Sequence, residues 1–200
     1  MTYEELIHLL KTSTTVDEIN SRREEIADLV PESRIMFDFD QRNHAHPYDL
    51  WIHSIHTVLG LLRSLDDDAL YLAALFHDIG KPSCQKPPVN ESDVSFHYPG
   101  HPAKSREIAE DIILPRIIDI GAPLSSHEKE LFIYYVAHHD DHMKISDELV
   151  KEYLEDISLE EFHHLMLLEV SDAIAHVQLP IIAERVRVCR ILSVYTLSSK

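Results

Sequence analysis

Four helix-start signals recur along the chain and favour an all-α fold. In each, a serine or threonine is followed three residues later by a glutamate, so that each side chain can cap a backbone N–H group of the other residue. The four pairs are Thr2/Glu5, Thr15/Glu18, Ser125/Glu128 and Ser158/Glu161. No segment alternates apolar and polar residues for long enough to predict a strand. Glycine, which all-β folds need at their turns, occurs only four times.

The apolar periodicity between these signals predicts a series of helices joined by short connections. The predicted helices span residues 3–10, 15–29, 48–64, 67–79, 102–119, 126–140, 147–155, 159–177 and 180–197. Pro180 is expected in the first turn of the last helix. The stretch "KPSCQKPPVNESDVSFHYPGHP" is rich in proline and polar residues and is predicted to be the one long loop.

One domain is expected for the whole chain, residues 1–200. A length of 200 residues with 44% apolar residues is enough for one sizeable core, and no repeat or linker divides the sequence. We expect the core at about residues 40–178, a helical pair within 1–30 that is loosely attached, and a C-terminal helix at 180–200.

Charge and composition exclude several partners and compartments. A formal net charge of −17 argues against duplex nucleic acid and anionic membrane as partners. No apolar run approaches the ~20 residues of a membrane span, and "MTYEELIHLL" does not resemble a signal peptide. Cys84 and Cys189 match no zinc or redox spacing. We therefore expect a cytoplasmic protein; the sequence predicts no oligomeric state.

The stretch "ALFHDIGKP" ends an apolar helix in His77 and Asp78, just before Gly80. Adjacent residues on a regular helix point about 100° apart, but at a frayed end both can turn toward one point. An imidazole nitrogen and a carboxylate oxygen suit a borderline divalent metal ion. The alternative is a histidine that interacts only with the helix dipole.

Asp172 lies in "LMLLEVSDAIAHV", which is apolar almost all round and is therefore predicted to be a buried helix. A buried carboxylate requires a cation, a metal ion or strong donors. The sequence leaves open a metal ion or a salt bridge to Arg185 or Arg187.

Further candidate histidines occur on other helices. His53 lies nearly opposite the apolar arc of "LWIHSIHTVLG", beside Gly60, so it faces either solvent or a closely packed second helix; His56 competes with it. His101 precedes Pro102 and is expected as a helix N-cap, near Lys104, where an anion could bind. His138 and His139 end an aromatic helix, where one or both could turn inward.

The order of these motifs resembles the HD superfamily of metal-dependent phosphohydrolases. "YDLWIHSIHTV" resembles the first-histidine helix, "LAALFHDIGKP" the central motif in its HDIG form, and "FHYPGHPAKSREIAEDIIL" the segment after it. "VAHHD" resembles the paired-histidine element and "LEVSDAIAHV" the final aspartate helix. With its lead-in "QRNHAHPYDLWIH", the chain is similar to the HD domains attached to bacterial tRNA nucleotidyltransferases, without the nucleotidyltransferase head. The resemblance implies an all-α helical bundle with a metal site between its central helices.

The resemblance also implies which residues bind metal. His53, His77, Asp78 and Asp172 match the ligands of one ion, and Asp78 would bridge to a second ion held by the histidines that match the further positions, His101, His138 and His139. Such a nitrogen-rich set favours Fe, Mn, Co, Ni or Zn over Mg.

The expected activity is hydrolysis of a phosphomonoester or phosphodiester of a small nucleotide or related metabolite. Asp78 and Lys81 are the predicted catalytic residues, and Lys81 and Lys104 are predicted to bind the phosphate of the substrate. Lys81 could equally be an exposed helix-end lysine. Two other functions stay open: a di-iron oxygenase on the same fold, or a non-catalytic metal-binding regulatory module.

Overall fold

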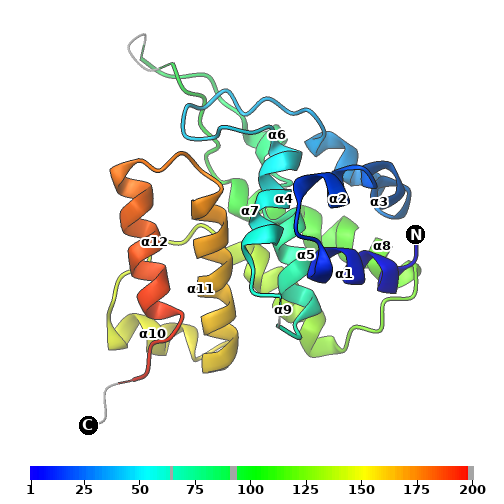
Figure 1. Cartoon of the computed structure of the whole chain (residues 1–200). Helices are drawn as coiled ribbons and strands as arrows, with labels where there is room; N and C mark the ends of the chain where they lie inside the picture. The colour runs from blue at the N-terminus through cyan, green and yellow to red at the C-terminus, as the bar shows by residue number, and fades with distance from the viewer. Residues whose placement is uncertain (64, 91–93, 198–200) are drawn as a thin grey trace.

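The computed structural model describes residues 1–63, 65–90 and 94–197, and this part of the chain is all-α (Figure 1). Within the described residues, extended pairing is limited to one isolated bridge between Lys86 and His97. The four predicted capping boxes form, and Pro180 lies in the first turn of the last helix. The predicted fold class is confirmed.

Four helices build the centre of the molecule. They are α4 (Leu50–Gly60), α5 (Asp68–Phe76), α9 (Ser126–His138) and α11 (Leu159–Ile174). Every residue of α5 from Ala69 to Phe76 is buried, as expected for a helix that is apolar all round. It packs against α4, α9 and α11, while α12 (Pro180–Leu192) covers the far side of α11 (Figure 1). Helices α4, α5 and α11 thus pack against one another in the core.

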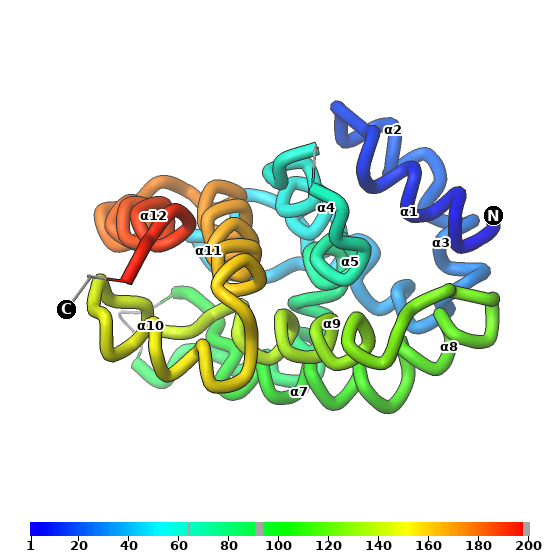
Figure 2. Tube along the Cα trace, turned by 90° about the horizontal axis from the view of Figure 1, so that it is seen from below, coloured from blue at the N-terminus to red at the C-terminus, as the bar shows by residue number. Residues whose placement is uncertain are grey.

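The predicted helix 102–119 is α7 (His101–Ile108), a π-helical turn η2 (Ala109–Ile113) and α8 (Leu114–Asp119) in succession. Pro115 has no N–H group to continue the regular hydrogen-bond series, which explains the wider turn before it. Helix α7 packs along α9, and Figure 2 shows this pair below α4 and α5. The short helix α10 (Asp147–Tyr153) precedes α11.

The N-terminal part contains α1 (Tyr3–Thr12), α2 (Val16–Asn20), α3 (Arg23–Leu29) and a 3₁₀ segment, η1 (Pro31–Met36). The prediction of one helix over 15–29 is wrong, because the chain turns between α2 and α3. Asn20 and Ser21 at this break are weak helix formers. Helix α1 packs on α5 and α2 packs on α4.

The structure describes the predicted long loop on both sides of residues 91–93, which lie outside the described part. The loop begins with the short helix α6 (Lys81–Cys84), and Lys86 and His97 exchange two backbone hydrogen bonds. Residue 64, the end of one predicted helix, also lies outside the described residues, as do residues 198–200.

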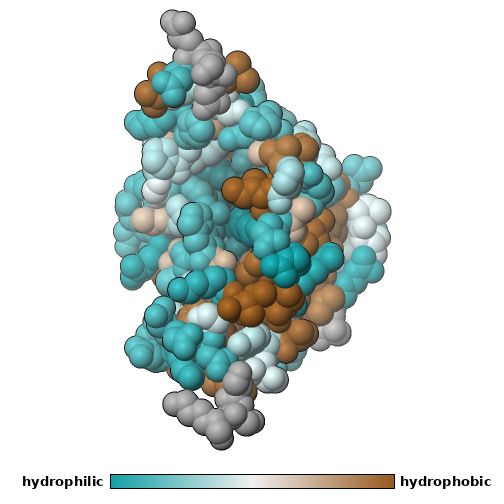
Figure 3. All heavy atoms as spheres, turned by 90° about the vertical axis from the view of Figure 1, so that its left-hand side faces the viewer, coloured by the Kyte–Doolittle hydropathy of each residue, from teal (hydrophilic) through white to brown (hydrophobic). Residues whose placement is uncertain are grey.

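Helix α12 buries Val186, Cys189 and Leu192. The face of the molecule on this side mixes hydrophilic and hydrophobic groups (Figure 3). Exposed apolar side chains on α12 and its flanks are Ile174, Val177, Ile181, Ile191 and Val194. Among the described residues, no helix combines the length and apolar character that a membrane crossing requires.

Candidate metal centre

A first group of potential ligands lies at the meeting point of α4, α5 and α11. It comprises His53, His77, Asp78 and Asp172, all buried, with one ligand atom from each within 4.8 Å of the others. Nε2 of His53 lies 2.9 Å from Oδ1 of Asp172 and 3.4 Å from Oδ2 of Asp78. Nε2 of His77 lies 3.2 Å from the same Oδ2. Two imidazoles and two carboxylates therefore converge on one small volume.

Close packing of α4 on α11 brings His53 to Asp172. A Cβ atom added at Gly60 would lie 2.9 Å from Cβ of Ser171, so only glycine permits this approach. His53 is fully buried between the two helices. Of the two environments that the sequence leaves open for His53, the structure shows the closely packed one. His56 instead stacks on Tyr48.

A tight turn after α5 carries Asp78 toward α7. His77 caps the C-terminus of α5, and the chain then turns through hydrogen bonds from Ile79 N to Phe76 O and from Lys81 N to Asp78 O. A Cβ atom at Gly80 would lie 2.5 Å from the backbone nitrogen of Ser105. The glycine thus lets the turn lie directly on α7.

A second group lies on the other side of the same carboxylate. Oδ1 of Asp78 is 3.2 Å from Nε2 of His101 and 3.4 Å from Nε2 of His139, and these two nitrogens are 3.3 Å apart. One ligand atom from each of the three residues lies within 4.8 Å of the others. Asp78 therefore directs one oxygen to each group.

Three of the histidines are held with Nε2 toward the centre. In each, Nδ1 donates to the carbonyl oxygen three residues earlier, at 2.8–3.0 Å. A carbonyl oxygen only accepts, so Nδ1 carries a proton, and Nε2 is the ring nitrogen left to bind a metal ion. Such a second contact fixes ring and tautomer in metal-binding histidines. The pairs are His77 with Ala74, His101 with Tyr98, and His139 with Val136.

The residues fit a divalent ion because their inward atoms face one another at 2.9–3.5 Å without forming hydrogen bonds, although Oδ2 of Asp78 also lies beside the Lys81 ammonium group. Nε2 of His53, Nε2 of His77, both oxygens of Asp78 and Oδ1 of Asp172 are buried without a hydrogen-bond partner. Leaving such groups unpaired costs about 1–3 kcal/mol each, or more when they are charged. A mixed nitrogen and oxygen set is one that borderline transition ions accept.

The buried charges perturb one another. Burial opposes protonation of His77, but the adjacent Asp78 and nearby Asp172 outweigh it and raise the pKa of His77 to about 10. Burial also opposes ionisation of Asp78, yet Lys81 and His77 hold the pKa of this carboxyl well below its ordinary value. A cation that binds His77 therefore displaces a proton, so its affinity falls as pH falls.

Asp172 forms the salt bridge to Arg185, one of the two alternatives that the sequence leaves open, and its other carboxylate oxygen faces the potential metal ligands. Its Oδ1 faces His53, while its Oδ2 lies 3.1 Å from Nη1 of Arg185 on α12. Arg185 also pairs with the fully buried Glu169 at 2.5 Å and donates to the carbonyl oxygen of His139 at 2.7 Å. The predicted burial of Asp172 is confirmed, and the guanidinium ties both ligand groups to α12.

Lys81 is buried rather than exposed at a helix end. Its side chain is 5% exposed, and Nζ lies 2.5 Å from Oδ2 of Asp78. It also donates to Oε1 of Gln41 and lies over the ring of Tyr98. The ammonium group faces the cavity that leads to the ligand groups.

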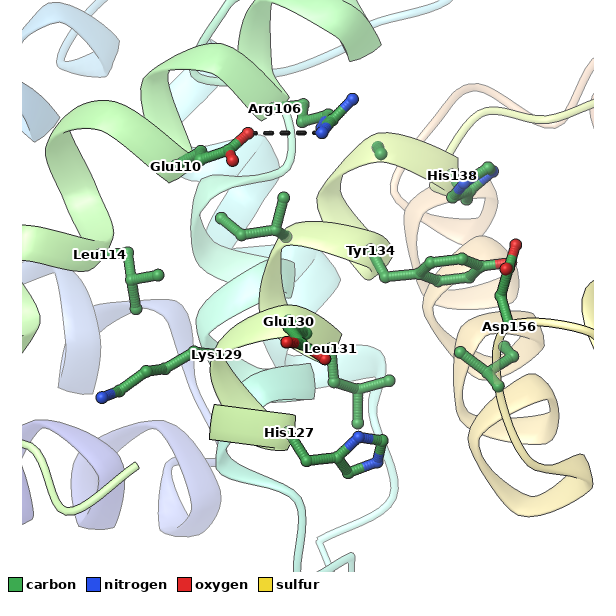
Figure 4. Close-up of a pocket in the computed structure, with 13 residues that line it drawn as sticks. Arg106, Glu110, Leu114, His127, Lys129, Glu130, Leu131, Tyr134, His138 and Asp156 are labelled. Atoms are coloured by element: carbon green, nitrogen blue, oxygen red, sulfur yellow. Dashed lines mark ion pairs between the residues drawn. The ribbon is translucent and has the colours of Figure 1, made fainter. Parts of the chain in front are cut away.

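His138 does not join either group, contrary to the sequence prediction. Its Nδ1 lies 2.7 Å from Oδ2 of Asp141, and its ring lies over Tyr134. With Asp156 it lines a separate pocket of about 540 Å³ beside α9 (Figure 4). Adjacent helix residues point about 100° apart, so only His139 of the pair can turn inward.

Lys104 also lies elsewhere than predicted. Its Nζ pairs with Oε1 of Glu107 at 2.5 Å on the outer face of α7, and it does not line the cavity. His101 is the first residue of α7 and not its N-cap, which is Gly100 with a φ of 74°.

A cavity of about 790 Å³ opens onto both groups. Asp78, His101, His139 and Asp172 lie on its wall together with the cations Lys81 and Arg185. Two further residues of the wall, His46 and His176, were not predicted as site residues from the sequence. His176 follows Asp172 by four residues, a spacing that places both on one helix face and could have indicated it.

Comparison with known proteins gives one family. Residues 50–118 match the family model of the HD domain, and no curated protein or solved structure matches the chain. The match includes His53, His77, Asp78 and His101, and the structure brings His139 and Asp172 to the same place. The HDIG form and the likeness to tRNA nucleotidyltransferases stay predictions. The likeness to the HD domain therefore covers residues 50–118 of this chain and includes four of the potential metal ligands.

Proposed function

We propose that this protein is a metal-dependent phosphohydrolase that cleaves a phosphomonoester or phosphodiester of a small nucleotide or related metabolite. The observation that supports this proposal is that the two carboxylate oxygens of Asp78 face different groups of potential ligands. Its Oδ2 faces His53 and His77, and its Oδ1 faces His101 and His139. Ligand groups on both sides of one carboxylate are typical of two-metal hydrolytic sites.

The first position would be held by His53, His77, Asp78 and Asp172, and the second by Asp78, His101 and His139. The nitrogen-rich donor set favours Fe, Mn, Co, Ni or Zn over Mg. When bound, such ions lower the pKa of coordinated water and polarise phosphate oxygens. The second position has fewer protein ligands, so we expect it to be filled less completely.

The chain's own cations would bind the phosphate. Lys81 and Arg185 bring positive charge to the wall of the cavity in a protein with a formal net charge of −17. Lys81 is therefore the proposed phosphate-binding residue, and Lys81→Gln is expected to raise KM more than it lowers kcat, the pattern for lost uniform binding. Unchanged KM in this variant would remove Lys81 from the substrate site.

The deciding experiment combines metal analysis with a panel of phosphate esters. Purified protein is loaded with Mn, Co, Fe or Zn and its metal content is measured. Release of phosphate is followed for each monoester, and release of the alcohol and the phosphomonoester for each diester. Turnover of at least one ester supports the proposal. Oxygen-dependent turnover with iron would identify an oxygenase instead, and bound metal without any turnover would indicate a regulatory module.

The neighbouring histidines provide a matched pair of variants. His139→Ala and His101→Ala are each expected to lose part of the bound metal and most hydrolysis while remaining folded. His138→Ala, next in the chain to His139, should keep both. Equal behaviour of the His138 and His139 variants would contradict the second position.

A further inference from the structure

A third cluster of imidazoles adjoins the first ligand group. One ring nitrogen from each of His46, His53 and His176 lies within 4.8 Å of the other two. The ring centroids are 4.3 Å apart for His46 and His176, and 5.0 Å apart for His53 and His176. Three histidines from separate segments of the chain thus meet at one point.

The backbone holds this cluster in place. The N–H of Val177 donates to the carbonyl oxygen of Ala45 at 2.9 Å, which joins the turn before α4 to the end of α11. His46 N donates to Asn43 O at 2.9 Å within that turn. The backbone hydrogen bond between Val177 and Ala45 therefore holds His46 and His176 next to each other.

The nitrogens of the cluster have lone pairs without partners. Nδ1 of His176 lies 2.8 Å from the carbonyl oxygen of Asp172, so it carries the proton and Nε2 has the free lone pair. Nδ1 of His46 and Nδ1 of His53 are buried without a hydrogen-bond partner, while Nε2 of His53 faces Asp172.

We propose that His46 and His176 form a third position for a divalent transition-metal ion, to which the ring of His53 contributes its remaining nitrogen; when the first ion is also bound, this ring bridges as an imidazolate and releases its N–H proton to water. It goes beyond the proposed hydrolysis, which two positions are sufficient to support. Neighbouring ligand groups have one residue in common. Asp78 belongs to the first and the second group, and His53 belongs to the first and the third.

The donor chemistry limits which ion binds there. The site contains imidazole nitrogens and no carboxylate, so it selects Co, Ni, Cu or Zn and discriminates against Mg and Ca. Metal–nitrogen bonds of about 2.0–2.1 Å require the rings to move closer when an ion binds. His46 and His176 also face the cavity, so the third ion is accessible to ligands from solvent.

The test is cobalt stoichiometry in the full chain, measured by elemental analysis after removal of loosely bound metal. The wild-type protein is expected to hold between about two and three ions, because the second position is expected to be filled less completely than the others. His46→Ala and His176→Ala should each lose one ion and retain the others. His56→Ala is the matched control, since His56 belongs to none of the groups, and it should keep the wild-type content.

Crystals of the cobalt-loaded protein give a second readout. Anomalous density between the rings of His46 and His176, absent in the His176→Ala variant, would support the third position. No density there, or an unchanged cobalt content in both variants, would overturn it. Loss of all bound cobalt in a variant that is still folded by circular dichroism would also overturn it, because the two residues would then serve the first position.

Discussion

Replacing Arg185 with methionine keeps an aliphatic side chain but removes a guanidinium that lies at the centre of a buried charge network. The guanidinium contacts Glu169 at 2.5 Å, Asp172 at 3.1 Å and Asp140 at 3.2 Å, and it donates to the carbonyl oxygen of His139 at 2.7 Å. Removing one partner of a buried ion pair typically costs about 3–5 kcal/mol of unfolding free energy.

At pH 7 the loss should lie near the lower end of this range. Glu169 is fully buried, with a side-chain exposure of 0%, and burial raises its pKa to about 8 even though Arg185 opposes the shift. Most molecules therefore hold the Glu169 proton at pH 7, and the variant leaves no new charge on this residue. We expect a loss of about 3 kcal/mol.

Above pH 8 the loss should increase. Without Arg185 the pKa of Glu169 rises further, so the folded variant retains a proton that the unfolded chain has already released. Where the folded state binds more protons, stability falls as pH rises. Wild-type Glu169 stops contributing to this fall near its pKa of about 8, whereas the variant continues to lose up to about 1.4 kcal/mol per pH unit.

The assay is urea denaturation of metal-free protein at pH 7 and pH 9, followed by circular dichroism. Glu169→Gln is the matched background, because glutamine keeps the shape and cannot ionise. In that background, the cost of Arg185→Met should be independent of pH. A cost that is equal at both pH values in the wild-type background, or one that grows with pH in both backgrounds, would refute the reasoning.

Three further substitutions test the packing and the revised substrate site. Gly60→Ala should destabilise the protein by about 1–3 kcal/mol in thermal or urea unfolding, because its Cβ would meet Ser171. Gly80→Ala should cost more than that, since the opposing atom is the Ser105 backbone nitrogen, and it should also reduce metal content; an unaffected metal content would show that this turn does not position Asp78. Lys104→Ala should leave KM for any ester substrate unchanged, and an increased KM would return Lys104 to the site.

Local signals in the sequence predict the helix starts well. A capping box needs only two residues that are three apart, so Ser125 with Glu128 can be recognised without knowledge of the fold. The break between α2 and α3 was not predicted. Asn20 and Ser21 have low helix propensity, but this preference is weak, and tertiary packing decides whether the helix continues through them.

The environment of the site residues depends on contacts between helices that are distant in the sequence, and local sequence patterns do not predict these contacts. Periodicity places His53 away from the apolar arc of α4, and only the contact between Gly60 and Ser171 shows that this face is buried. Likewise, the sequence does not indicate which residue of the pair His138 and His139 faces the site. The rotation of α9 against α7 decides that His139 faces Asp78.

The ligands of the first group come from helices that are far apart along the chain, on α4, at the end of α5 and on α11. An unfolded chain cannot present them together, so any cation that binds there selects the folded state. Each tenfold rise in free metal concentration above the dissociation constant then adds about 1.4 kcal/mol to the unfolding free energy. Resistance of this protein to heat and proteolysis should therefore follow the supply of metal in its surroundings.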